Sequence, residues 1–164
     1  MKIGLAMTED HASTRRVVDQ AFRPEDVVSF LDALRADGCI LDEWVAEDES
    51  GLLGHIVFSR VWVEQGNGAR LPAAMLTPLA VRPDRQRSGI GTDLMNHAIQ
   101  ELEARGETLF LVLGHPDYYP RAGFSAEKAA KVESPWTGNP AFMARASSAP
   151  EGKLILPQPI IDAA

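Results

Sequence analysis

Two glycines, Gly89 and Gly91, lie where an apolar run passes into a helical pattern, within the segment Gln86–Gly91. Glycine lets the backbone approach a ligand closely and adopt positive φ angles. The first N–H groups of a helix have no partner inside it, and with the helix dipole they favour an anion. Arg85 and Arg87 flank the glycines and can pair with phosphate oxygens. The segment therefore predicts a phosphate or pyrophosphate site, although an isolated glycine pair is more often only a tight turn.

The phosphate ligand can be narrowed by elimination. The sequence has no Gly-x-x-x-x-Gly-Lys-Ser/Thr motif, which excludes an ordinary P-loop. Leu94 occupies the place of the third glycine of a dinucleotide fingerprint, and the next strand ends in Gly114 rather than in an acidic residue. Coenzyme A remains as the candidate ligand.

A strand, helix, strand unit is predicted around this loop. Its parts are a strand at Leu71–Val81, a loop at Arg82–Gly91, a helix at Thr92–Arg105 and an apolar strand at Thr108–Leu113. We expect the two strands to be parallel, with a right-handed crossover.

Helices and an antiparallel meander are predicted before this unit. Apolar residues at helical spacing indicate helices at His11–Phe22 and Pro24–Asp37, both preceding the main sheet. Leu41–Val63 holds two apolar runs split by an acidic turn at Glu47–Gly51, which is typical of a hairpin. The acidic residues of this hairpin, Glu43 included, are expected to face solvent.

Length and charge limit the possible classes of protein. The 164 residues, 45% hydrophobic and 24% charged, fit one globular domain. The net charge of −7 and the lack of basic runs argue against a nucleic-acid partner, and a cationic amine suits this charge better. No apolar run is long enough for a signal peptide or a membrane span, so we expect a cytoplasmic protein with no membrane partner. The single cysteine, Cys39, is expected to be a small buried hydrophobe.

The segments Leu79–Gly91 (LAVRPDRQRSGIG) and Tyr119–Phe124 (YPRAGF), with the helix between them, resemble the GNAT family of N-acetyltransferases. The run LGHPDYYPRAGF is similar to one bacterial subgroup of that family. The resemblance is strong from about Met75 to Phe124. It implies an α+β fold of the GNAT type, with a mixed, mostly antiparallel sheet, a splayed parallel strand pair and about four flanking helices. We expect an N-acetyltransferase domain at 1–146 and a tail at 147–164, with Leu154–Leu156 as a candidate edge strand.

The resemblance also implies how acetyl-CoA would be bound as cosubstrate. Backbone groups of Leu79, Ala80 and Val81 would bind the pantetheine arm. Backbone N–H groups would hold the pyrophosphate, and the residues that supply them would be Arg87, Ser88, Gly89, Ile90, Gly91 and Thr92. A primary amine would then attack the thioester directly, with no covalent enzyme intermediate. Independently of the resemblance, His11 and His97 do not pair with cysteines or carboxylates at ligand spacing, so no metal is predicted.

Tyr119 matches the tyrosine of the family pattern Tyr-x-x-x-Gly-Phe and would be the general acid that protonates the departing thiolate. The alternative is that it is a packing aromatic. The general base is less clear, because no acidic residue stands on the predicted strand that ends at Leu113. His115 is a possible base, with a solvent-facing loop histidine as the alternative. His55 and Glu64 are weaker candidates on earlier strands.

The acceptor is not identified by the sequence, and it could be an amine-bearing small molecule or a protein. The competing hypothesis is a non-catalytic module of the same fold that binds an acyl-CoA as a sensor. A nucleotide-dependent enzyme is a third hypothesis. A homodimer is possible, since many relatives dimerise.

Overall fold

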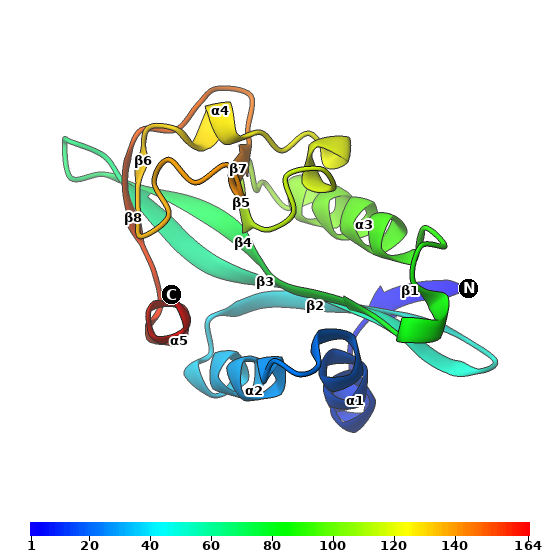
Figure 1. Cartoon of the computed structure of the whole chain (residues 1–164). Coiled ribbons are helices and arrows are strands. Elements are labelled where there is room, and N and C mark those ends of the chain that lie inside the picture. The colour runs from blue at the N-terminus through cyan, green and yellow to red at the C-terminus, as the bar shows by residue number, and fades with distance from the viewer.

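A long, twisted sheet separates two groups of helices in the computed structural model, which describes residues 1–164 (Figure 1). The strands are β1 (Lys2–Leu5), β2 (Ile40–Asp48), β3 (Gly51–Glu64), β4 (Arg70–Val81), β5 (Phe110–Leu113), β6 (Val132–Glu133), β7 (Phe142–Arg145) and β8 (Gly152–Ile155). The helices are α1 (His11–Phe22), α2 (Val27–Asp37), α3 (Ile90–Ala104), α4 (Ala126–Ala129) and α5 (Gln158–Ala163). None of them combines the length and hydrophobicity that a membrane span requires.

The strand order is β1-β2-β3-β4-β5-β7, with β8 pairing to the far end of β3 and to β6. Neighbouring strands are antiparallel except for β4 with β5 and the short β6 with β8. The predicted mixed, mostly antiparallel sheet is therefore confirmed. One prediction is wrong, since β1 precedes the two N-terminal helices and pairs with β2. Its four residues are too short for a clear alternation pattern.

Several boundaries differ from the predicted ones for local reasons. Helix α2 begins at Val27 rather than at Pro24, because the Asp26 side chain accepts a hydrogen bond from the Ser29 N–H at 3.0 Å and caps the helix there. Helix α3 begins at Ile90, two residues before the predicted Thr92, so its first turn contains Gly91. In the tail, Leu154 lies in β8, opposite Val63 of β3.

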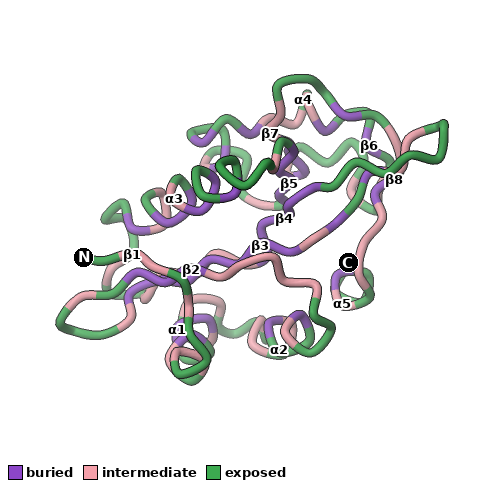
Figure 2. The backbone as a smooth tube through the Cα atoms, turned by 180° about the vertical axis from the view of Figure 1, so that it is seen from behind, coloured by how far each residue is buried: buried purple, intermediate pink, exposed green.

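Both faces of the central strands are buried by helices. Helix α3 covers one face, where Leu94 and Met95 pack into the cluster that contains Phe58 of β3. Helices α1 and α2 cover the other face, where Val18 and Leu31 are fully buried. Figure 2 shows this burial along β3 and β4 and along the inner sides of the helices.

A buried polar cluster joins α1 and α2 to the sheet. The Glu43 carboxylate of β2 accepts a hydrogen bond from Arg35 of α2 at 2.8 Å and one from His55 Nε2 of β3 at 2.7 Å. Arg35 also donates to the Thr14 hydroxyl of α1 at 2.9 Å. The expectation that Glu43 faces solvent is therefore wrong, because the carboxylate pairs with an arginine that the hairpin sequence does not contain.

The protonation states in this cluster follow from its contacts. His55 is fully buried and its Nδ1 has no hydrogen-bond partner, so a proton there would be unsatisfied. Burial accordingly lowers the pKa of His55, and the neutral ring donates through Nε2. Burial by itself would raise the pKa of Glu43, but the hydrogen bonds from His55 and Arg35 and the Arg35 charge outweigh it and lower the pKa to about 2.

We predict that Glu43→Gln destabilises the protein at neutral pH and that this effect fades in acid. A pKa depressed from 4.5 to about 2 corresponds to roughly 3 kcal/mol of stability. That contribution is complete above pH 4.5 and is lost as the pH falls through about 2. Urea unfolding across this range measures the gap between the wild type and the variant. Glu47→Gln, exposed on the same strand, is the control, and a gap that stays constant with pH contradicts the prediction.

Candidate active site

The parallel strands β4 and β5 part shortly after they meet. They pair only at Ala74 with Phe110 and at Met75 with Leu111. From there β4 stays with β3 and β5 stays with β7, so the facing edges have no strand between them. A β-bulge between Leu76 and Leu79 places three residue steps of β4 against two of β3 and bends β4 at the same point.

One cavity of about 780 Å³ follows the end of β4 into the first turn of α3. Every residue predicted to bind acetyl-CoA lines it except Ser88, and those that do are Leu79, Ala80, Val81, Arg87, Gly89, Ile90, Gly91 and Thr92. The Ser88 hydroxyl instead bonds the Arg85 carbonyl. The end of β4 and the glycine loop before α3 thus form two walls of one cavity. From the sequence, only the family resemblance indicated that both would bind the same ligand.

The end of β4 presents its backbone to this cavity at alternate residues. The Arg82 N–H bonds the Leu53 carbonyl of β3 at 2.7 Å, so Ala80, two residues earlier, also directs its N–H and C=O toward β3. Leu79 and Val81 direct theirs away from β3, and the Val81 carbonyl accepts a hydrogen bond from the Gln86 side chain at 3.0 Å. Ala80 therefore contributes a wall to the cavity rather than backbone donors.

The entry into α3 is a cradle of free backbone donors. Arg87 has φ 63° and Gly89 has φ 90°, so both residues adopt the left-handed backbone conformation. This conformation directs neighbouring N–H groups toward the inside of the loop. The Asp93 N–H bonds the Gly89 carbonyl, but no acceptor in the chain meets the N–H groups of Ile90, Gly91 and Thr92. These donors and the helix dipole favour an anion.

The two arginines beside the glycines, Arg85 and Arg87, differ in whether they form an ion pair. The Arg87 side chain is exposed and forms no ion pair in the chain. The Arg85 guanidinium pairs with the Asp48 carboxylate of the β2–β3 hairpin at 3.0 Å. Both arginines line the larger cavity, but the charge of Arg85 is already paired and that of Arg87 is not. The sequence does not show this difference, because Asp48 is distant from the loop.

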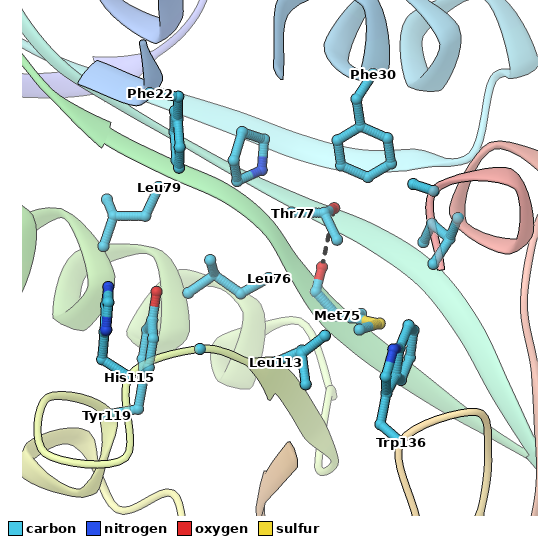
Figure 3. Close-up of a pocket in the computed structure, with 14 residues that line it drawn as sticks. Phe22, Phe30, Met75, Leu76, Thr77, Leu79, Leu113, His115, Tyr119 and Trp136 are labelled. Atoms are coloured by element: carbon cyan, nitrogen blue, oxygen red, sulfur yellow. Dashed lines mark hydrogen bonds between the residues drawn. The ribbon is translucent and has the colours of Figure 1, made fainter. Parts of the chain in front are cut away.

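A second cavity, of about 310 Å³, opens where the strands part (Figure 3). Its walls come from the bulge of β4, Phe22 and Phe30 of the first two helices, Leu113 at the end of β5, Trp136 and helix α5. Four residues line both this cavity and the larger one, namely Phe22, Leu79, His115 and Tyr119. The two spaces therefore meet beside Tyr119.

Tyr119 is held edge-on between its neighbours. Its ring lies 5.1 Å from that of Tyr118 and 6.0 Å from that of Phe124, both in T-shaped contacts. A Cβ atom at Gly114 would lie only 2.3 Å from Tyr119 Cε2, so the ring occupies space that any larger residue would fill. The hydroxyl has no hydrogen-bond partner in the chain, and burial, with a smaller contribution from Tyr118, raises the pKa of Tyr119 to about 12.

Tyr118 is placed at the helix entry rather than in the core. Its hydroxyl is 3.1 Å from Thr92 Oγ1, and a Cβ atom at Gly91 would lie 2.9 Å from that hydroxyl. The Arg121 guanidinium lies 5.5 Å from the centre of its ring. Tyr118, Arg121 and Phe22 line the larger cavity although none of them was predicted to bind the ligand, and Gln86 of the predicted glycine segment lines it too. Arg121 lies inside the segment Tyr119–Phe124 and Tyr118 directly before it, whereas Phe22 is distant from both motifs and the sequence holds no signal for it.

The structure separates the three candidate bases. His115 is exposed on the loop after β5 and lines both cavities. His55 is buried against Glu43, and Glu64 pairs with Arg70 at 3.0 Å beside the distant β3–β4 turn, so neither reaches the junction. Cys39 is half-buried, with its sulfur 3.8 Å from the Leu34 carbonyl and in neither cavity. No group of three or more potential metal ligands is present.

Comparison with known proteins decides the family. The model of the acetyltransferase (GNAT) family matches residues 5–124. The chain belongs to the GNAT family. Membership confirms the resemblance and, with it, the enzyme class, an acyl-CoA-dependent N-acyltransferase.

Individual relatives agree with this placement. A GNAT acetyltransferase from Brucella melitensis, solved with acetyl-CoA, has 30% identity and a TM-score of 0.80, with 97% of each chain covered. Escherichia coli YhbS, solved with CoA, shares the fold with a TM-score of 0.87 and 24% identity over 98% of this chain and 91% of that one. The uncharacterized N-acetyltransferase YjhQ of E. coli is 39% identical over 80 residues, which are 49% of this chain and 44% of YjhQ.

We predict that Gly114→Ala lowers the free energy of unfolding by about 1–3 kcal/mol, the usual cost of overpacking, because its methyl group meets the Tyr119 ring. Urea unfolding measures this loss. Tyr119→Ala removes the clash, so the double variant should lose less stability than the two single losses added together. Gly4→Ala, where a Cβ atom meets nothing within 4 Å, is the control and should change stability by less than about 0.5 kcal/mol. Additive losses at Gly114 and Tyr119 contradict the proposed contact.

Proposed function

We propose that the protein transfers an acetyl group from acetyl-CoA to a primary amine by direct attack, with Tyr119 as the general acid. One observation carries the proposal: a cavity that ends in a cradle of free N–H groups meets a second, apolar cavity beside the Tyr119 hydroxyl. Such a junction provides one compartment for a phosphate-bearing donor and another for an acceptor, with a proton donor between them.

The residues of the larger cavity fit the groups that coenzyme A carries. The N–H groups of Ile90, Gly91 and Thr92, with the exposed Arg87, suit a pyrophosphate. The outward backbone groups of Leu79 and the N–H of Val81 suit the amides of a pantetheine arm, because an unpaired strand edge bonds an extended chain as a neighbouring strand would. These residues would hold the cosubstrate and direct its thioester toward Tyr119.

Tyr119 has the properties of a proton donor to a leaving thiolate. A phenol with a pKa of about 12 stays protonated at every pH at which the protein would work. Full transfer to a thiolate with an ordinary pKa near 8.5 would be uphill by roughly 5 kcal/mol. The same burial that raises the pKa of Tyr119 also disfavours the charged thiolate, which narrows this difference. Tyr119 would thus stabilise the charge that develops on sulfur as the carbon–sulfur bond breaks.

The amine must lose a proton to become a nucleophile. His115 is the one histidine at the junction and lies at the solvent-exposed side of both cavities. We place it as the base that accepts this proton, directly or through water, and passes it to solvent. The enzyme then needs no covalent intermediate, which agrees with the position of Cys39 outside both cavities.

We predict that Tyr119→Phe lowers kcat about 100-fold while the Kd of acetyl-CoA changes less than threefold, because the variant keeps the ring and loses only the proton donor. Thiol release across a panel of amines measures kcat, and calorimetry measures Kd. In the wild type, Tyr119 should cause no alkaline loss of activity below about pH 11, since its pKa is about 12.

The same two measurements test the proposed function as a whole. Heat of acetyl-CoA binding together with amine-dependent thiol release supports an acetyltransferase. Binding without release from any amine supports a non-catalytic sensor of the same fold. Absence of binding to well-folded protein overturns both.

We predict that His115→Ala changes the pH dependence of kcat/KM. If both the free amine and His115 must be unprotonated, log kcat/KM rises with a slope of two at low pH in the wild type and with a slope of one in the variant. His97→Ala, a mid-helix histidine of α3 that lines neither cavity, is the control. An unchanged slope in His115→Ala removes His115 as the base.

A further inference from the structure

The smaller cavity carries information about the acceptor that the family does not supply. No aspartate, glutamate, lysine or arginine lines its volume of about 310 Å³. Figure 3 shows Phe22 and Phe30 on one side and Leu113 and Trp136 on the other, with Leu76 and Met75 of β4 between them. Ile160 and Ala163 of helix α5 line it as well. The body of an acceptor would therefore meet mostly hydrocarbon and aromatic rings.

The few polar groups of this cavity leave its interior without a site for charge. The Thr77 hydroxyl is already hydrogen-bonded to the Ser59 hydroxyl at 2.8 Å, and Ser59 is fully buried. Of the other polar side chains, His115 and Tyr119 lie at the mouth that the two cavities share, and Trp136 adds an indole N–H farther in. An indole N–H only donates hydrogen bonds, so it offers no acceptor to an ammonium group.

The negative charge of the chain does not extend into this space. Glu43, the buried carboxylate on the same side of the sheet, is neutralised by Arg35 and lines neither cavity. An ammonium group carried deep into the cavity would have no partner, and burying an unpaired ion costs several kcal/mol. A single amine at the mouth avoids this cost, since the apolar surroundings favour its neutral, nucleophilic form.

We infer that the acceptor is a small primary amine on a compact hydrocarbon or aromatic body, and that diamines, polyamines and amino acids are poor acceptors. This inference rests on the proposed function, because it assigns the second cavity to the acceptor. It differs from the expectation that a cationic amine suits the net charge of −7, because no acidic side chain lines this cavity.

Matched amines test the inference. Hexylamine and 1,6-diaminohexane have the same length and differ only in the second amino group. We expect kcat/KM for hexylamine to exceed that for the diamine at least 30-fold, and 2-phenylethylamine to exceed lysine by a similar factor, because each disfavoured amine brings a further charge into the cavity. Comparable or faster turnover of the diamine overturns the inference and leaves the acetyltransferase proposal intact.

A charge placed in the cavity should reverse the preference. Phe30→Glu introduces a carboxylate, and Phe30→Gln introduces a side chain of the same length without charge. The ratio of diamine to hexylamine turnover should rise at least tenfold in Phe30→Glu and should stay within threefold of the wild-type ratio in Phe30→Gln. An equal rise in both variants means that cavity size, not the missing charge, sets the preference, and contradicts the inference.

Calorimetry of the same amines with the CoA-loaded wild-type protein separates the two proposals. Binding of hexylamine that is at least tenfold tighter than that of the diamine, with no thiol release from acetyl-CoA in the turnover assay, supports the apolar site and counts against the acetyltransferase. Equal or no binding of the two amines, with no turnover preference, overturns the inference.

Discussion

The separation of β4 from β5 is the constraint on which the other features depend. The pair is held only at Ala74–Phe110 and Met75–Leu111, and each strand is then fixed by a neighbour on its other side. Because β4 pairs with β3 and β5 pairs with β7 beyond this point, the opening between them is built into the sheet topology. Unpaired strand edges are usually covered or shortened in proteins. Here the edge of β4 instead lines the larger cavity, while the bulge at Thr77 and Pro78 lines the smaller one.

The two cavities that result differ in chemistry because different elements form their remaining walls. The larger one is closed by the start of α3, whose free N–H groups make it suitable for an anion. The smaller one is closed by aromatic side chains of α1 and α2 and by α5, which add no charge. Net charge therefore describes the surface of this protein and not its site. Glu43 and Asp48 illustrate the difference, because each pairs with an arginine of another element.

Tyr119 connects stability with function. Its ring fits against Gly114 with no space for a side chain, and its hydroxyl remains without a partner in the chain. Burial raises its pKa to about 12 and so keeps the proton that the proposed reaction uses. A hydrogen bond to another side chain would have fixed the orientation of that hydroxyl and would have left it less able to donate its proton to a ligand. An unpaired hydroxyl at the junction of two cavities is the arrangement that perturbed groups at functional sites often show.

Local sequence patterns were enough to predict the main helices and strands and the glycine loop before α3. Periodicity predicted the main helices and the strands from β2 to β5, and the glycines before α3 predicted the cradle, since both depend on neighbouring residues. Only the tertiary structure shows which charged side chains are already paired, because Arg85 pairs with Asp48, 37 positions away, and Arg35 pairs with Glu43. It also decided the smaller cavity. The residues that line it extend from Phe22 to Ala163, and no local pattern can show that such distant side chains surround one space.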